Sequence, residues 1–198
     1  MKPLGMTESA GKYQRLADKS NVAYPHSTIE GKLKQLKTMD ISTGEAAAGI
    51  YASVHDLGKW LLLHLNNGKN GEEILITKEN HDALWTPNTI TGFNAEPNAP
   101  YKTHFEAYGL GWEIDDKNGY TVISHGGGLP GMLSKTRIIP ELDLGIVVLT
   151  NADPGGYSYE FISRSIADSY LGLDDMDWIS RVSPWLESSQ QKADSVMN

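Results

Sequence analysis

The feature that most constrains this chain is a glycine-rich segment between two strand-like runs, Ser124-His125-Gly126-Gly127-Gly128-Leu129-Pro130-Gly131. An alternating run, residues 120–123, leads into the segment, and a second strand-like run, residues 132–139, leads out of it. Because glycine has no side chain, a ligand can approach such a backbone closely. The segment therefore predicts a strand edge that presents N–H groups and one imidazole to a ligand.

Two common motifs match these glycines but lack their usual surroundings. Gly126, Gly128 and Gly131 fit the dinucleotide fingerprint G-x-G-x-x-G, which requires a following helix N-terminus to hold the pyrophosphate, whereas a strand is predicted here. His125 and the three glycines after it also fit the oxyanion loop of lipase-like hydrolases. That fold needs a G-x-S-x-G elbow, and the nearest segment, residues 156–160, ends in glutamate. Both interpretations are disfavoured.

Composition excludes several functional classes. The 198 residues are 39% hydrophobic and 21% charged, which describes a globular chain long enough for a core. The net charge is −8 and no basic cluster is interleaved with aromatic residues, so no nucleic-acid partner is expected. Without cysteine, and with histidines that lack metal-ligand spacing, neither a metal nor a cofactor is expected.

Membrane and targeting signals are also missing from the sequence. The apolar runs are too short to span a bilayer, so no membrane span is expected. No apolar segment of the signal-peptide kind follows Met1, and this leaves the cellular compartment open.

The periodicity of apolar residues changes from helical to strand-like along the chain. Helical spacing predicts helices over residues 53–66, 77–87 and 159–170, the first beginning with a capping box at Ser53. Alternation predicts strands over residues 108–114, 120–125, 132–139 and 144–150, with a turn over 115–119.

The predicted fold class is α/β of the α+β type, an antiparallel sheet flanked by helices over residues 1–173. Residues 144–150 are apolar on both faces and are expected at the centre of the sheet. Residues 86–106 are expected to form a long polar loop. Residues 174–198 are expected to be a C-terminal extension with a frayed tail.

Several aromatic residues have a structural explanation. His64 lies on the inner stripe of the first predicted helix and is expected to be a core residue with its hydrogen bonds satisfied. Trp60, Trp85 and Trp112 are expected to be core aromatics.

Five sequence blocks in order resemble the C-terminal half of the class C beta-lactamase-like serine hydrolases, which include family VIII esterases and penicillin-binding-protein-like peptidases. The blocks are residues 3–7 (PLGMT), 48–57 (AGIYASVHDL), 108–112 (YGLGW), 125–128 (HGGG) and 145–151 (GIVVLTN). The resemblance covers about residues 3–171. It implies the C-terminal portion of a beta-lactamase/transpeptidase-like fold, and ester or amide hydrolysis through an acyl-enzyme.

The resemblance also implies roles for the glycine-rich segment. His125 takes the basic position that attracts or hydrogen-bonds a substrate carboxylate, and Gly127 keeps the strand edge open. The backbone N–H of Gly128 would contribute to an oxyanion hole, a kind of donor worth about 3–4 kcal/mol. Gly126 and Tyr108 complete the candidate substrate-binding set.

The nucleophile is where the sequence departs from the family. In relatives, a Ser-x-x-Lys motif and a Tyr-x-Asn motif precede the PLGMT block, and this sequence starts at that block. Ser9 and Lys12 match Ser-x-x-Lys literally, but they lie in a polar stretch with Gly11 between them. The leading hypothesis is therefore a fragment or subunit of a serine hydrolase that is inactive alone.

Two alternatives remain open: a non-catalytic binding module or pseudoenzyme, and a compact hydrolase that uses Ser9 and Lys12. The expected ligand is a small ester or amide with an acyl or peptide-like group. A partial domain exposes apolar surface, so a homo-oligomer or a complementing N-terminal segment is expected. Relatives of this family are often periplasmic or extracellular.

Overall fold

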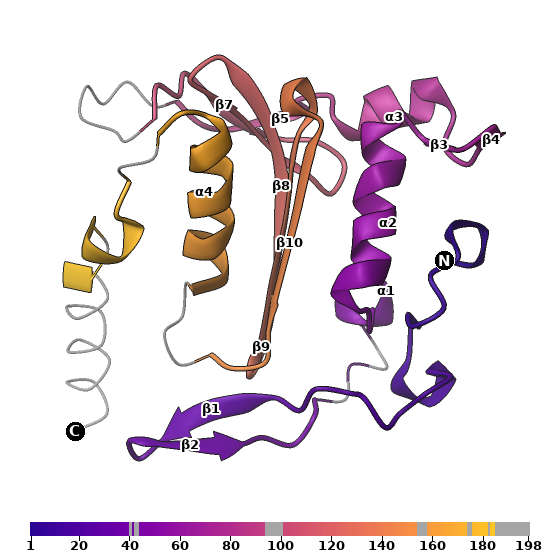
Figure 1. Ribbon diagram of the computed structural model, residues 1–198, viewed down its shortest axis with the longest axis vertical. Coiled ribbons are helices and arrows are strands. Elements are labelled where there is room, and N and C mark those ends of the chain that lie inside the picture. The colour runs from indigo at the N-terminus through magenta and orange to yellow at the C-terminus, as the bar shows by residue number, and fades with distance from the viewer. Residues whose placement is uncertain are drawn as a thin grey trace.

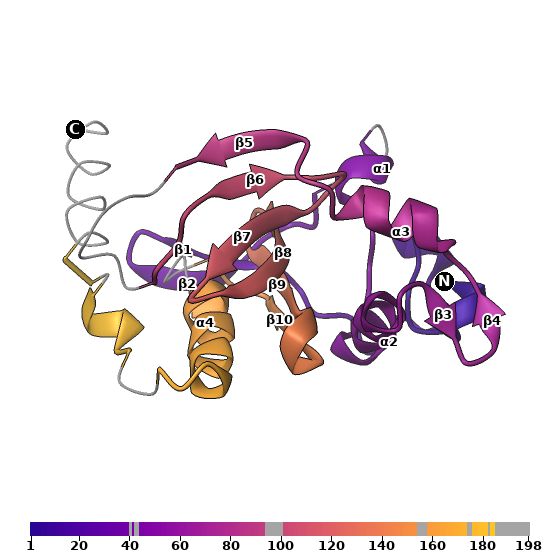
Figure 2. The same cartoon turned by 90° about the horizontal axis from the view of Figure 1, so that it is seen from above.

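An antiparallel sheet with helices on both faces forms the centre of the computed structural model (Figures 1 and 2). The structure describes residues 1–39, 41, 44–93, 101–153, 158–173, 176–181 and 183–184. In these ranges, six strands follow one another in the sheet in chain order: β5 (Thr89–Gly92), β6 (Glu106–Tyr108), β7 (Glu113–Lys117), β8 (Tyr120–Leu129), β9 (Met132–Ile139) and β10 (Leu144–Thr150). The predicted fold class is confirmed.

Helices cover the two faces of this sheet. Helix α2 (Val54–Leu65) packs on one face of β9 and β10, and α4 (Ser158–Tyr170) packs on the other face (Figure 1). Helix α3 (Lys78–Leu84) follows α2. As predicted, Ser53 caps α2, its Oγ accepting the Asp56 N–H at 3.1 Å. Thr77 caps α3 in the same way through the N–H of Asn80.

Shorter elements complete the described part of the chain. They are η1 (Lys2–Leu4), η2 (Tyr13–Arg15), β1 (His26–Ile29), β2 (Lys32–Gln35), α1 (Glu45–Ala48), β3 (Lys69–Asn70), β4 (Glu73–Ile74) and η3 (Pro140–Leu142). The β1–β2 hairpin lies against the turn between β8 and β9, where the His26 N–H donates to the Gly131 carbonyl at 3.4 Å. No described helix is both long and apolar enough to cross a membrane.

Two apolar clusters fill the space between the sheet and the helices. The α2 side contains Leu61, Ala107, Trp112, Ile114, Ile123 and Ile138, and the α4 side contains Val122, Ile139, Ile146 and Ala167. Consecutive strand residues therefore serve opposite clusters, as the alternation of side chains in a strand requires. The predicted core role of Trp60, Trp85 and Trp112 is confirmed, because all three lie in or against the α2-side cluster.

The position predicted for β10 is wrong. It is an edge strand, paired with β9 alone among the described residues. Its apolar character has another cause, because α2 and α4 cover its two faces. Ile146 is buried in the α4-side cluster, and on the α2 side Gly145 admits Leu61, whose Cβ would lie 3.2 Å from an added side chain.

The predicted loop and first strand also need correction. Strand β5 lies within the expected loop and pairs with β6. The expected strand over residues 108–114 is interrupted, since β6 ends at Tyr108 and β7 begins at Glu113. Gly111, with a φ of 80°, turns the chain between them. The alternation of apolar residues therefore continues across the turn between the two strands, and the alternation alone does not reveal that turn.

The remaining predicted elements hold with changes at their ends. Strand β7 continues through Lys117, so the turn is confined to Asn118-Gly119, whose φ values of 53° and 88° suit a tight hairpin. Strand β8 extends to Leu129 and includes the glycines. Most of the predicted frayed tail, residues 185–198, lies outside the described residues. Trp178 of the extension is buried and donates its indole N–H to Asp168.

Candidate active site

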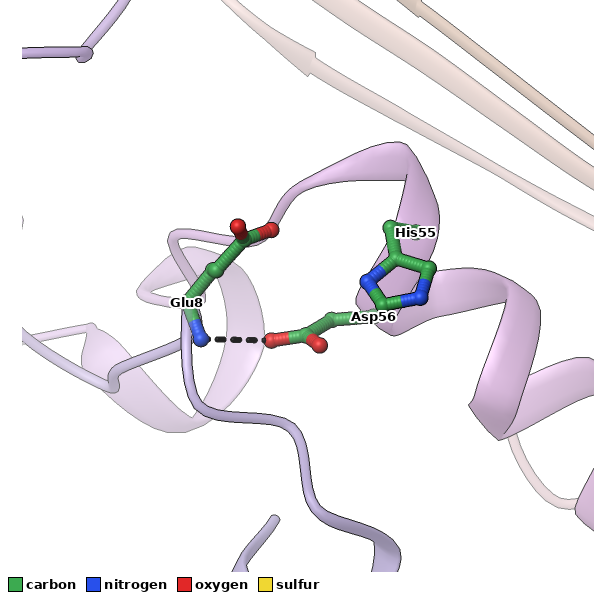
Figure 3. Close-up of side chains that lie close together, drawn as sticks. All are labelled: Glu8, His55 and Asp56. Carbon is green, nitrogen blue, oxygen red and sulfur yellow. Dashed lines mark hydrogen bonds between the residues drawn. The ribbon is translucent and has the colours of Figure 1, made fainter.

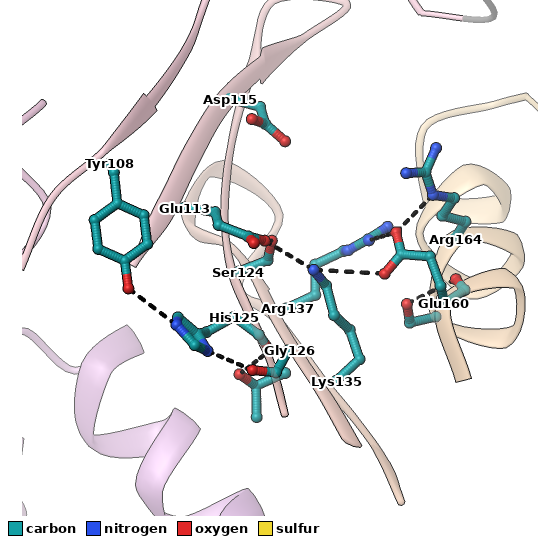
Figure 4. A network of polar contacts seen from close by, with 12 residues as sticks. Tyr108, Glu113, Asp115, Ser124, His125, Gly126, Lys135, Arg137, Glu160 and Arg164 are labelled. Carbon is teal, nitrogen blue, oxygen red and sulfur yellow. Dashed lines mark hydrogen bonds and ion pairs between the residues drawn. The ribbon is translucent and has the colours of Figure 1, made fainter. Parts of the chain in front are cut away.

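The imidazole of His125 is held in one orientation by two hydrogen bonds (Figure 4). Nδ1 lies 2.6 Å from the carbonyl oxygen of Gly126, and Nε2 lies 3.0 Å from the hydroxyl of Tyr108. A carbonyl can only accept, so Nδ1 carries a proton, and the Nε2 of the neutral ring accepts from the phenol. The ring itself is exposed. The structure thus brings together two of the predicted site residues, His125 and Tyr108.

The backbone after His125 has an open edge. Strand β9 pairs with β8 as far as Leu129, but β7 pairs with β8 only from Tyr120 to Ser124. From His125 onward, β8 therefore has one strand neighbour among the described residues. In an antiparallel ladder, alternate residues direct their N–H groups away from the paired strand, so this edge offers unpaired donors.

The glycines keep this stretch free of side chains. A Cβ on Gly127 would lie 2.6 Å from the Ser134 Oγ. Gly127 and Gly128 are exposed, and Gly126 is half-buried. An imidazole, a phenol and exposed backbone N–H groups thus lie along one edge, an arrangement able to bind a carbonyl or carboxylate oxygen.

The candidate nucleophile Ser9 lies in a different environment. Its Oγ donates to the Oδ2 of Asp56 at 2.8 Å, at the beginning of α2. Lys12 is the N-cap residue of η2. Burial raises the pKa of Asp56, but hydrogen bonds from Lys59, Ser9 and the Glu8 N–H outweigh burial. The net pKa lies below its usual value, so this carboxylate is a weak base. The Ser9 hydroxyl thus donates to a carboxylate that is a weak base.

Asp56 also belongs to a group that resembles a metal site, together with Glu8 and His55 (Figure 3). Their ligand atoms lie within 4.8 Å of one another. However, Asp56 is fully buried and already accepts from the Glu8 N–H and from the Lys59 ammonium, at 2.8 Å and 3.0 Å. An ion would have to displace this ammonium, so the residues do not fit a metal. The group instead attaches residues 8–9 to α2.

A charged network on the α4 side of the sheet was missed by sequence reasoning. Glu113 accepts from Ser124 and Lys135 at 3.1 Å and 2.9 Å, and Glu160 of α4 pairs with Lys135, Arg137 and Arg164 (Figure 4). These residues line a cavity of about 340 Å³ that Tyr108 also borders. Charges at every second position of β7 and β9 were the available signal.

Around Glu160, three cationic side chains surround one carboxylate. Burial raises the pKa of this carboxyl, but Arg137, Arg164 and Lys135 outweigh burial and lower the pKa to about 2. Glu160 therefore stays ionised throughout the neutral range. Three cations share this one carboxylate, which makes it the electrostatic centre of the packing between α4 and the sheet.

A family model and several solved structures are similar to this chain. A family model described as Beta-lactamase matches residues 1–170. No curated protein sequence matches the chain significantly.

Solved structures show the same fold. An octameric penicillin-binding protein homologue from Pyrococcus abyssi is 25% identical over 86% of this chain and 35% of its own, with a TM-score of 0.67. A penicillin-binding protein from Bacillus halodurans is 19% identical over 83% of this chain and 46% of its own, with a TM-score of 0.58.

A D-amino acid amidase from Ochrobactrum anthropi SV3 is 15% identical over 87% of this chain and 47% of its own, with a TM-score of 0.59. The chain thus spans less than half the length of each of these three structures.

Proposed function

This chain belongs to the beta-lactamase family, and from this premise we propose that it supplies the substrate-binding part of a serine hydrolase site for esters or amides. One observation carries the proposal: β8 loses its β7 neighbour at His125, where Tyr108 orients the imidazole. The open backbone would accept the acyl carbonyl, with the Gly128 N–H stabilising negative charge on its oxygen. A substrate carboxylate would take the place of the Tyr108 oxygen at Nε2 of His125, whose imidazole would then carry a proton on both nitrogens.

In the proposed mechanism the nucleophile comes from a complementing segment. An attacking hydroxyl would give its proton to a base on that segment and add to the carbonyl carbon, and the oxygen would gain negative charge at the glycine edge. The same proton would then pass to the departing alcohol or amine as its bond to the carbonyl carbon breaks, which gives an acyl-enzyme. Water would then release the acid. His125 and Tyr108 would bind and orient the substrate, since their mutual hydrogen bond fixes the imidazole plane.

A binding measurement tests this role without requiring turnover. Benzylpenicillin, which carries both a carboxylate and an acyl carbonyl, is expected to shift the amide NMR signals of residues 125–128. His125→Ala should weaken the binding about tenfold or more, the effect of losing one charge-assisted hydrogen bond. His55→Ala, at an exposed position on α2, is the matched control. Unchanged signals at 125–128 at saturating ligand would contradict the proposal.

Intact-mass measurement separates this proposal from the compact hydrolase. After incubation with a fluorescent penicillin or a p-nitrophenyl ester, no covalent adduct is expected on the chain alone. An adduct that disappears in Ser9→Ala would instead establish Ser9 as the nucleophile. A third outcome would favour the pseudoenzyme alternative. The ligand would bind at residues 125–128, but no adduct would form and no turnover would occur when complementing segments are added.

The exposed surface supports association with another chain. Ile162, Ile166 and Tyr170 lie at four-residue intervals on α4 and are 48%, 39% and 59% exposed. Strand β10, on which α4 packs, has a free edge among the described residues. Both features favour association, since apolar stripes and unpaired strand edges attract partners. The relative from Pyrococcus abyssi is described as octameric.

We expect the isolated chain to form a homo-oligomer, which light scattering after size exclusion would measure. Ile166→Lys places a charge in the exposed stripe and should shift the population toward the monomer. Ser165→Lys, one residue away on α4 and also exposed, is the matched control and should leave the assembly unchanged. A wild-type chain that is monomeric at all concentrations would rule out self-association.

A further inference from the structure

Two histidines are buried side by side where α2 meets α3. His64 is 0% exposed and His81 is 2% exposed, and their ring centroids lie 5.3 Å apart. His64 also contacts the rings of Trp60, Trp85 and Trp112, at centroid distances of 4.5, 5.8 and 5.1 Å. The expected burial of His64 is confirmed.

The expectation that the hydrogen bonds of His64 are satisfied is wrong. Neither of its ring nitrogens has a hydrogen-bond partner among the described residues, and the same holds for Nε2 of His81. The His81 ring hydrogen-bonds the backbone of His64. Nitrogens without hydrogen-bond partners cost folding free energy when they are buried among aromatic rings, and a positive charge on the ring would cost more free energy still.

Both rings are therefore held in the neutral form. Burial, and then the repulsion of His81, lowers the pKa of His64 to about 4, and burial also lowers the pKa of His81. The charged groups acting on the pair come from α3: Asp82 favours protonation of His81, and Lys78 opposes it. These two pair with each other at 2.5 Å, so neither supplies a dedicated counter-ion. From α2 and from residues 109–112, the rings of Trp60 and Trp112 contact His64.

The end of α3 is connected directly to the backbone of the candidate active site. The Leu84 carbonyl accepts the N–H of Leu110 at 3.0 Å, and the Asn88 N–H donates to the Tyr108 carbonyl at 3.0 Å. The fit is close, because a Cβ on Gly109 would lie 2.3 Å from the Leu84 oxygen. Movement of α3 would therefore move the backbone that positions the Tyr108 phenol.

We infer that His64 and His81 form an acid-sensitive latch, which holds α3 against residues 109–112 when neutral and releases this region when protonated. Release would separate Tyr108 from His125, and this last step rests on the proposed function. The latch itself depends only on burial, the ring contacts and the two backbone hydrogen bonds. The histidines bind protons more readily in an unfolded or opened state than when they are buried, so acid favours the release of α3.

A pH titration of the full chain without substrate tests the latch separately from the proposed function. Near-UV circular dichroism, which reports tryptophan packing, should change between about pH 6 and 4, while far-UV signal from the sheet persists. Hydrogen exchange should accelerate in residues 78–92 and 106–112 before it does in β9. Loss of both spectra at one midpoint would show global unfolding and overturn the inference, as would an unchanged near-UV signal down to pH 4.

Variants identify the titrating groups. His64→Phe keeps a flat ring without a proton and should lower the midpoint of the near-UV transition by about one pH unit or more. His81→Phe should act in the same direction, and it provides an independent measurement if His64→Phe does not fold at pH 7. His55→Phe, exposed on the same helix, should leave the midpoint unchanged. Wild-type midpoints in both buried-site variants would contradict the latch.

Discussion

Glu160→Gln is expected to lower the free energy of unfolding by about 3–5 kcal/mol, the cost of breaking a buried charge pair from one side. The carboxylate accepts from Arg137 and Arg164 at 2.8 Å and 2.6 Å and lies 3.4 Å from the Lys135 ammonium. Glutamine retains the volume but removes the charge. Arg137, Arg164 and Lys135 would then lose their shared counter-ion, although Glu113 still pairs with Lys135 and Asp115 still acts on Arg164.

The same carboxylate predicts a specific dependence of stability on pH. Its pKa is about 2 in the folded chain and near 4.5 in the unfolded chain, so the unfolded state binds the proton first. The stabilisation, about 3 kcal/mol, is complete above pH 4.5 and is lost as the pH falls toward 2.

Urea denaturation at several pH values measures both effects. The difference in unfolding free energy between wild type and Glu160→Gln should be largest at neutral pH and should shrink between about pH 4.5 and 2. Glu79→Gln, exposed on α3, is the control and should change stability by less than about 0.5 kcal/mol. A loss for Glu160→Gln below about 1 kcal/mol would show that the network contributes little.

Trp112→Ala is expected to lower the free energy of unfolding by about 3–5 kcal/mol, because it removes a large buried side chain. Trp112 is 6% exposed and lies in the α2-side cluster with Ile114 and Ile123. Its ring also packs on His64. The substitution would leave a cavity beneath residues 109–112, with the Tyr108 backbone at its border.

A ligand for the new cavity distinguishes lost packing from general disruption. Indole is expected to bind the Trp112→Ala chain and to recover part of its stability, as apolar molecules do in engineered core cavities. Trp112→Phe, which leaves a smaller void, should cost less than Trp112→Ala. Thermal denaturation with and without indole provides the measurement, and equal effects of indole on wild type and variant would contradict a specific cavity.

Patterns with local causes were predicted well from the sequence. The capping residue Ser53 and the apolar spacing behind it placed α2, and apolar spacing placed α3, because caps and helical periods act within a few residues. The alternation over residues 120–125 and the Asn118-Gly119 turn likewise predicted β8 and its hairpin, although β8 extends to Leu129. The ordered sequence blocks pointed to the family that the family model then matched.

Features that depend on spatial neighbours were predicted poorly. Apolar residues on both faces of β10 indicated coverage by two layers, and this was mistaken for a central position in the sheet. His64 was assigned to the core from its place on α2, but its missing hydrogen bonds depend on rings brought in from α3 and from residues 109–112. The ion pairs of Glu160 with Lys135 and Arg137 join residues more than 20 positions apart, so local spacing did not suggest them.

The sequence by itself determined which segments are helical or extended, which faces of them are apolar, and where bare backbone follows a histidine. Only the tertiary structure decided that β7 stops pairing with β8 at Ser124, so that the edge from His125 onward is open and Tyr108 can reach the imidazole. The physical reason is that side-chain period records which surfaces are buried, while strand register and strand ends follow from the packing of the whole sheet.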